Sequence, residues 1–537
     1  MKKIVTIALG MAVAFTAMAQ NWQDALLFSE NNYSGTARSV AMGNAVTAIG
    51  GDPGSLVFNP AGGAVSSYSQ FFFSPGLTYS VMRSQGTILS GDTDPIGLGD
   101  KVRTGYTRMK LPSAGFVFNM DTGRRNGWKR YSFGFLAHST GNFTGRLNGA
   151  GVNYDNSYAA SLATWADGYT TAQLGNSDWF SPGPSWASMT GFKSGMINSV
   201  NGTDNAYVAV TEVMDGSGNI RLAAPLYQKY GQQTTGSKVD MLFSFSANYD
   251  DVLYLGVNLG VTNLSYSMNE YWYEEPYDPA EFPAINYSDG TSATLNSLIM
   301  KRAYEASGAG IYLKGGVLWR PVAGLRVGAA FQTPMLLDIT ERYHYTGSTS
   351  LSGKTTAAVS SAEDEWGYTL RNPFRMNFGV AYSFGAFAVV SADYEFANLG
   401  NSRFRSRERY GASDFDSVNA DISEFLGPQH QLRVGVEVKP LPVLAVRGGF
   451  GYTGSAETVP QGADYWQNRF SLAKTNASLG LGYSSGGSFY ADAAVRLRFV
   501  PKEYLIPYEY ADPNILTPEI EVKSTLMDAM ITLGWRF

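Results

Sequence analysis

Several residue types on which enzymes and metalloproteins depend are scarce or missing in this chain of 537 residues. There is no cysteine, which excludes disulfide bonds, thiolate metal ligands and cysteine nucleophiles. The three histidines, His138, His344 and His430, stand in no catalytic or metal-binding motif. His138 and Ser139 are adjacent, so on a strand their side chains would point to opposite faces and could not act together. We therefore expect no catalytic residue, no metal site and no cofactor, and interpret the protein as a non-enzyme.

Charge is also scarce, because only 16% of the residues are Asp, Glu, Lys or Arg, against roughly 25% in an average soluble domain. The 40 basic and 45 acidic residues give a net charge of -5, which supplies no footprint for a nucleic acid. A mean hydropathy of -0.14 and the absence of a long apolar run after the first 20 residues argue against membrane helices. Aromatic residues and glycine are plentiful instead, with 33 Tyr, 30 Phe and 60 Gly.

The amino terminus resembles a secretory signal peptide. Lys2 and Lys3 precede the apolar stretch 4–15, and Ala17-Met18-Ala19 has the small-x-small form that signal peptidase accepts. We expect residues 1–19 to be removed and the mature chain to begin at Gln20. With no cysteine after this point there is no site for a lipid anchor.

From about residue 68 onward, one parity of each segment is apolar and the other is small, polar or charged, which is the pattern of half-buried strands. In 489–499 the odd positions are Phe, Ala, Ala, Val, Leu and Phe, whereas the even positions include Asp492, Arg496 and Arg498. The pattern predicts about 14 strands, an even number of the kind that bacterial outer-membrane barrels have. The predicted strands are 68–83, 108–121, 130–142, 237–249, 252–267, 302–319, 324–341, 366–383, 386–396, 428–439, 443–452, 468–483, 488–500 and 521–537.

Short and long connections alternate between these strands. Asp250-Asp251 and Phe384-Gly385 are tight joins, for example, whereas the neighbouring joins are long. Transmembrane barrels have tight periplasmic turns and long outer loops, whereas Greek-key sandwiches have no reason to alternate in this way. The last strand alternates up to a terminal aromatic residue, Phe537, which resembles the signal read by the outer-membrane assembly machinery.

We therefore predict an all-β protein: a transmembrane antiparallel β-barrel of about 14 strands, closed because an open sheet edge would leave unpaired backbone groups in lipid. The predicted domains are a signal peptide (1–19), an N-terminal plug or hatch (20–67) and the barrel with its long outer loops (68–537). Inward charges of both signs, such as Asp393, Arg496 and Asp528, are interpreted as a hydrogen-bonded scaffold and not as an ion-selective pore.

Residues 20–67 do not alternate, and their glycines and small apolar residues indicate a compact segment that could fill a wide barrel. Within it, the run from Ser34 to Ala45, then Asp52, then Leu56-Val57-Phe58-Asn59-Pro60-Ala61-Gly62 resembles the hatch of the FadL-type long-chain fatty acid and hydrocarbon transporters. In that family a hatch ending in Asn-Pro-Ala precedes a 14-stranded barrel, so the resemblance covers the whole mature chain. Proline fixes its own φ and favours an extended residue before it, so Asn59, Pro60, Ala61 and Gly62 are the predicted gating corner; the simpler interpretation is an ordinary turn into the first strand.

Two sets of apolar residues are candidate ligand contacts. The resemblance implies a ligand pocket near the mature amino terminus, which by position falls on Leu26, Leu27 and Phe28. Within the long connection 143–236, Trp179, Phe180 and Trp186 are either the core of a lid or a docking surface for apolar ligands, and the sequence does not separate these roles.

The resemblance also implies a sideways exit at a kink in the third strand. Gly134 and Gly141 lie in that strand, where glycine permits a bulge or bend, although glycine is abundant throughout the chain.

These features predict an outer-membrane protein, in the bilayer of a Gram-negative bacterium, for passive uptake of long-chain fatty acids or other hydrophobic small molecules. Hatch gating and lateral release are expected, and the partners are the hydrophobic ligand, outer-membrane lipid and lipopolysaccharide, and the assembly machinery. Two alternatives stay open: an outer-membrane carrier in a protein secretion system, and a general water-filled porin.

Overall fold

The computed structural model describes residues 21–87, 95–215, 217–287, 290–407, 415–458 and 473–537. The predicted signal peptide and the start of the predicted strand 468–483 lie outside these ranges. No helix in the described part of the chain is long and apolar enough to cross a membrane.

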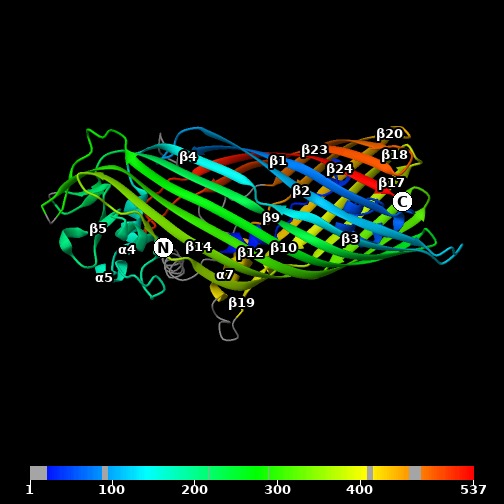
Figure 1. Cartoon of the computed structure of the whole chain (residues 1–537), viewed down its shortest axis with the longest axis horizontal. Coiled ribbons are helices and arrows are strands. Elements are labelled where there is room, and N and C mark those ends of the chain that lie inside the picture. The colour runs from blue at the N-terminus through cyan, green and yellow to red at the C-terminus, as the bar shows by residue number, and fades with distance from the viewer. Residues whose placement is uncertain (1–20, 88–94, 216, 288–289, 408–414, 459–472) are drawn as a thin grey trace.

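Fourteen strand positions form one closed antiparallel barrel, as the alternation predicted. Each position pairs with its neighbour in sequence order, and β1 pairs with β24 to close the ring (Figure 1). The ring consists of β1 (Gln70–Gly86), β2 (Val102–Asp121), β3 (Trp128–Asn142), β9 (Leu226–Tyr249), β10 (Leu253–Pro276), β12 (Ser292–Val322), β13 (Leu325–Gln332) continued by β14 (Leu336–Ser352), β16 (Asp364–Arg371) continued by β17 (Arg375–Phe384), β18 (Ala388–Asn398), β20 (Pro428–Leu441), β21 (Leu444–Thr453), β22 (Lys474–Ser484), β23 (Phe489–Leu505) and β24 (Ile520–Arg536).

Two of the predicted strands are each divided into two pieces. The predicted strand 324–341 is broken at Thr333-Pro334-Met335, and the predicted strand 366–383 is broken at Asn372-Pro373-Phe374. The two breaks lie opposite one another, because Gln332 pairs with Arg375 and Leu336 pairs with Arg371. Proline has no backbone N–H to donate to a ladder, so alternation alone did not reveal the interruption.

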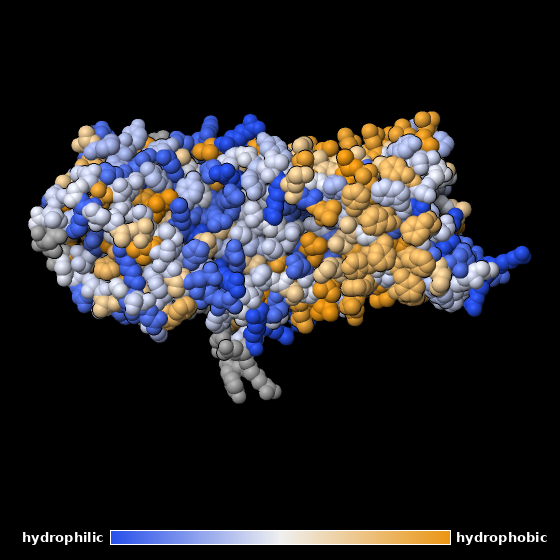
Figure 2. All heavy atoms as spheres, viewed as in Figure 1, coloured by the Kyte–Doolittle hydropathy of each residue, from blue (hydrophilic) through white to orange (hydrophobic). Residues whose placement is uncertain are grey.

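On the face seen in Figure 2, apolar side chains form a band across one half of the barrel, with hydrophilic side chains on both sides of it. Several strands continue well beyond the band. β9 begins at Leu226, 11 residues before the predicted start at 237, because pairing continues through a polar stretch that includes Gln228 and Gln232. Above the apolar band the wall needs no apolar alternation, so the sequence pattern underestimated its height.

The remaining elements lie within the barrel or at the end with the long connections. Residues 21–67 form α2 (Trp22–Ser29), α3 (Ala37–Ala41), η1 (Pro53–Val57) and η2 (Pro60–Val65). The long connection after β3 contains β4 (Gly145–Asn153), α4 (Tyr158–Ala166), α5 (Thr171–Leu174), α6 (Trp186–Lys193), β5 (Ile197–Ser199), η3 (Val200–Gly202), β6 (Tyr207–Ala209), β7 (Glu212–Met214) and β8 (Ile220–Leu222). Short elements elsewhere are β11 (Ile285–Asn286), β15 (Val359–Ser360), η4 (Leu399–Asn401), β19 (Arg403–Ser406) and α7 (Asp416–Phe425).

Candidate functional site

The N-terminal segment 21–67 lies in the space that the strands enclose, where the dark blue elements of Figure 1 run between the walls. Buried inward side chains of the barrel donate to its backbone: Lys314 to the carbonyl of Val57 at 2.7 Å, and Asn258 to that of Leu56 at 2.7 Å. On the far wall, Asp393 accepts from the backbone N–H of Thr47 at 2.7 Å. Because these contacts come from β10, β12 and β18, several sides of the ring hold the segment at once.

An ion pair of Arg38 joins the same segment to a charged network on the wall formed by β20, β21 and β23. Arg38 of α3 binds Glu437 at 2.9 Å, and Arg447 bridges Glu437 at 2.6 Å and Asp492 at 2.5 Å. Apart from Arg38, these side chains are at least nine-tenths buried. Removing one partner from such a network leaves a buried charge without a counter-ion, which costs free energy. This side of the segment is therefore firmly attached.

The corner at Asn59 and Pro60 is built closely against the wall. Asn59 accepts from the N–H of Ala61 at 3.1 Å and so caps η2, while its amide donates to the carbonyls of Thr47 and Val317, both at 3.0 Å. The wall has glycine at this point, because a Cβ on Gly316 would lie 2.1 Å from the Asn59 side chain. The predicted corner therefore ties η2, the 47–49 turn and β12 together.

The barrel wall is interrupted between β2 and β3. Their ladder runs from Asp121–Arg130 to Ser113–His138 and ends there, although β2 continues back to Val102 and β3 forward to Asn142. The ladder ends next to Pro112, which lies in a register shift between β1 and β2. In the described part of the chain, no backbone ladder joins the rest of β2 to β3 or β4.

Beyond the interruption the chain bends into the barrel. The β3–β9 register shifts between Ser139 and Gly141, and after Asn142 the chain continues as β4, which pairs with β9 and with no other strand among the described residues. Asn148 of β4 contacts the inward side chains of Ser84 on β1 and Thr104 on β2. The N-terminal segment meets the bend, because the N–H groups of Asn32 and Ser34 donate to the carbonyls of Thr140 and Ser139 at 2.7 and 2.9 Å.

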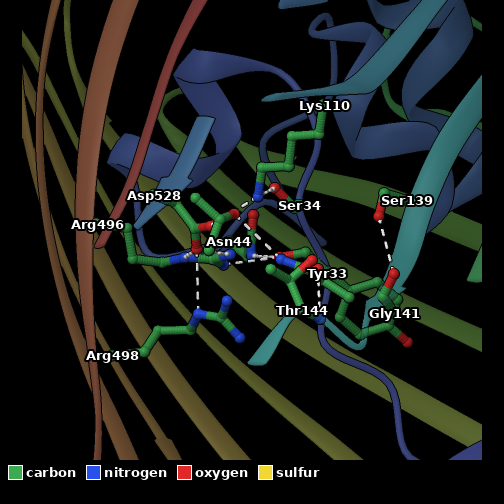
Figure 3. A network of polar contacts seen from close by, with 12 residues as sticks. Tyr33, Ser34, Asn44, Lys110, Ser139, Gly141, Thr144, Arg496, Arg498 and Asp528 are labelled. Carbon is green, nitrogen blue, oxygen red and sulfur yellow. Dashed lines mark hydrogen bonds and ion pairs between the residues drawn. The ribbon is translucent and has the colours of Figure 1, made fainter. Parts of the chain in front are cut away.

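A cluster of cations lines the lumen beside this interruption (Figure 3). The carboxylate of Asp528, fully buried on β24, pairs with Lys110 at 2.6 Å, Arg496 at 2.9 Å and Arg498 at 3.1 Å. One acid thus faces three cations. Nη2 of Arg498 and Nη1 of the nearby β2 residue Arg108 are buried without a hydrogen-bond partner. The cluster has a surplus of positive charge and unused donors.

The cluster also contacts the N-terminal segment and the bend in β3. Lys110 donates to Ser34 at 3.3 Å and Arg496 donates to the carbonyl of Tyr33 at 2.7 Å. Asn142 donates a hydrogen bond to the hydroxyl of Thr78 at 3.1 Å, and this hydroxyl donates to Asp528 at 2.6 Å. Nearby, His138 is fully buried with both ring nitrogens unpartnered, and it packs against Gly35, where a Cβ would lie 2.1 Å from its ring. The wall interruption, the segment and the cations thus form one continuous site.

The two predicted sets of ligand contacts lie in separate apolar clusters. Phe28 is fully buried at the end of α2 and makes edge contacts with Phe143 and Tyr266, while Leu26 and Leu27 are partly exposed beside it. Trp179 and Trp186 pack against a second cluster built around α4 and α6. Phe180 contacts Trp186 but is 63% exposed. The structure therefore does not join the two sets in one pocket.

The two glycines predicted at the sideways exit differ in position. Gly134 lies within unbroken pairing on both sides, opposite Val117 and Ser244, with Leu56 of the N-terminal segment against its inner face. Gly141 lies at the register shift, where a Cβ would come within 3.0 Å of Lys238. Only Gly141 is therefore at the bend.

Sequence reasoning missed most of the cation cluster. Arg496 and Asp528 were interpreted as scaffold charges, and Lys110 and Arg108 were not singled out. The available signal was two arginines of one parity, Arg496 and Arg498, on the strand before the one that carries Asp528. No group of residues that could hold a metal ion occurs in the described ranges.

Comparisons with known proteins agree with this architecture. No protein-family model matches the chain, and no curated protein matches its sequence. Among solved structures, it is similar to a FadL homologue from Pseudomonas aeruginosa, with 12% identity, 94% of this chain and 98% of that chain covered, and a TM-score of 0.52. The toluene transporter TodX from Pseudomonas putida has 13% identity, the same coverages and a TM-score of 0.49. The first of these likenesses confirms for the fold the resemblance noted in the sequence.

Proposed function

We propose that this barrel of FadL-type fold lies in the bacterial outer membrane and takes up hydrophobic small molecules passively, releasing them sideways through the wall between β2 and β3. The observation that carries the proposal is the end of the β2–β3 ladder at Ser113–His138, beside a cation-rich lumen that residues 32–34 cover. With the long connections outside, the interruption lies between the lumen and the bilayer.

Sideways release is favoured because an apolar ligand then avoids water. Each CH₂ kept out of water saves about 0.8 kcal/mol, so a long acyl chain strongly prefers a lipid exit over an aqueous one. Next to the unbroken part of the ladder, the outer wall has an apolar hollow of about 590 Å³ lined by Phe116, Phe133, Phe135, Phe243 and Phe245, among other residues. This hollow is a suitable surface for an acyl chain that leaves the barrel.

We propose long-chain fatty acids as the ligand class because the lumen offers donors for an acidic head group. Lys110, Arg496 and Arg498 face a single carboxylate, and the unused nitrogens of Arg498 and Arg108 could bind a second. A neutral hydrocarbon would leave these donors unpaired.

Residues 20–67 are the proposed hatch. The Arg38–Glu437 ion pair anchors one side of it. At the interruption, residues 32–34 are joined to β3 by two backbone hydrogen bonds, to β2 by Lys110, to β23 by Arg496 and to β18 by the bond from the Tyr33 hydroxyl to Glu395. A movement of residues 32–34 that broke these contacts would open the exit without detaching the side that Arg38 anchors. Asn59 to Gly62 form the corner about which we expect this movement, and Leu26, Leu27 and Phe28 are proposed to contact the ligand above it.

Native mass spectrometry of the purified full-length protein tests the ligand class, followed by uptake of radiolabelled hexadecanoate into cells that express it. We expect a co-purified or exchangeable fatty acid and protein-dependent uptake. Uptake no faster than in cells that lack the protein would contradict the proposal.

A further inference from the structure

Three cations lie side by side on the outer face of the barrel, on three adjacent strands. Arg83 of β1 pairs in register with Arg103 of β2 on one side and with Lys523 of β24 on the other. All three are exposed. Because neighbouring strands are about 5 Å apart, the three charges occupy a row roughly 10 Å wide.

The row lies one step above the apolar band. The outward residues in the preceding row are Gly105, Val81 and Thr525, and Thr525 pairs with Phe499, which is 43% exposed. A step of two residues along a strand is about 7 Å. This matches the thickness of the head-group layer that covers the hydrocarbon core of a bilayer.

The row is electrostatically unfavourable by itself. Like charges directly opposite one another on a sheet destabilise it. Lys523 has one partner, Glu521 at 2.8 Å, but in the described part of the chain neither Arg83 nor Arg103 forms an ion pair. Two arginines without an ion-pair partner among the described residues therefore lie next to each other, at positions where neutral polar residues would avoid the repulsion.

A tyrosine lies just below the row. The hydroxyl of Tyr79 lies 3.2 Å from the position that a Cβ on Gly105 would take, so the glycine leaves space for the phenol. Gly105 is two residues along β2 from Arg103. The face therefore combines two guanidinium groups, an ammonium and a phenol above an apolar surface.

We propose that this row, Arg83, Arg103 and Lys523, binds the phosphate groups of an outer-leaflet glycolipid, whose acyl chains lie on the apolar band beneath it. Phosphate fits because arginine binds its oxygens in bidentate fashion and because two negative charges would neutralise adjacent arginines. The inference rests on the proposed outer-membrane orientation, which places this end of the strands in the outer leaflet.

Lipopolysaccharide binding to the full-length protein in a neutral detergent tests the proposal. We expect Arg83→Gln and Arg103→Gln each to weaken binding about fivefold, the effect of one basic residue at an anionic surface. Lys301→Gln is the matched control, because Lys301 is an exposed outward cation whose neighbours across the ladders, Tyr271 and Thr346, are neutral. It should bind as the unmodified protein does.

Arg83→Glu separates a binding role from a structural one. It replaces two repulsive neighbours by attractive ones, so it should abolish lipopolysaccharide binding and yet raise the thermal midpoint in detergent without lipid. Enzymatically dephosphorylated lipopolysaccharide should bind weakly to every variant, and inorganic phosphate should not displace the intact lipid at equal concentration.

Equal binding by Arg83→Gln, Arg103→Gln and the unmodified protein would overturn the proposal, as would tight binding of the dephosphorylated lipid or displacement by inorganic phosphate. None of these assays measures fatty acid uptake. Loss of uptake with intact phosphate-dependent binding would contradict only the proposed function, and the reverse result would contradict only this site.

Discussion

Two neighbouring parts of the barrel wall differ sharply in completeness. β9 and β10 pair over 24 consecutive residues without a register shift, whereas β2 and β3 pair over only nine. Both pairs alternate in the same way, so the difference comes from a few residues, Pro112 at the end of the short ladder and Gly141 at the bend. A wall can thus be opened by single residues on strands whose overall pattern is unchanged.

The largest effect should follow removal of what covers the opening from inside. Deleting residues 20–67 should leave a folded barrel and increase single-channel ion conductance on the order of tenfold, since a barrel of this size has a wide interior once it is not filled. Planar bilayer recordings measure this, with heat-modifiable migration as the check on folding. Unchanged conductance in a folded barrel would mean that the segment does not block the lumen.

An effect no larger than this is expected from the cations beside the opening. Arg498→Gln should lower uptake of hexadecanoate relative to hexadecanol roughly tenfold, because a charged hydrogen bond to the acid contributes about 1.5 kcal/mol. Competition between the two labelled ligands measures the ratio. Arg342→Gln, which removes an exposed ion pair with Glu365, is the control and should leave the ratio unchanged. An unchanged uptake ratio in Arg498→Gln would show that Arg498 does not bind the acidic head group.

The two glycines of β3 sharpen the comparison further. Gly141→Ala should reduce uptake about fivefold, because the added Cβ crowds Lys238 at the bend at a cost of about 1 kcal/mol. Gly134→Ala, in the unbroken part of the ladder, is the matched variant and should keep near-normal uptake. The opposite ranking would place the exit lower in the wall.

The smallest effect on uptake is expected outside the wall. Burial raises the pKa of Glu212 to about 7, and its carboxylate accepts from the N–H of Ala209 at 2.9 Å. The pKa of Glu212 in the folded protein is above its usual 4.5. Its contribution to the free energy of unfolding is therefore fully present below pH 4.5 and is lost as the pH rises through 7.

Glu212→Gln should therefore stabilise residues 154–225 by about 2 kcal/mol at pH 8, allowing for partial exposure, and change nothing at pH 4. Hydrogen exchange of that region at both pH values measures this, and uptake should be unaffected. Equal protection of the two proteins at pH 8 would show that Glu212 ionises normally.

The fold was largely predictable from the sequence, because the alternation of 489–499 and of the other strands reports which face of the wall is apolar and points outward. The breaks at Pro334 and Pro373 and the upper part of β9 were missed. Proline removes a hydrogen bond without changing the alternation, and polar residues continue the wall beyond the apolar band. The site was less predictable. Lys110, Arg498 and Asp528 come from three strands, and their convergence depends on register, which alternation does not give.

Locking the wall shut tests the central claim most directly. Cysteines at Met109, which is exposed on the outer face, and Asn142, which contacts Thr78 in the lumen, can be joined by a cleavable bifunctional maleimide in a chain with no native cysteine. The linker would then lie across the interruption between β2 and β3. The control pair, Ala247 and Leu255, bridges β9 and β10 where they are already in register. We predict that the first cross-link abolishes fatty acid uptake, that its cleavage restores uptake, and that the control pair changes nothing. Full uptake through a barrel verified as cross-linked between 109 and 142 would contradict lateral release.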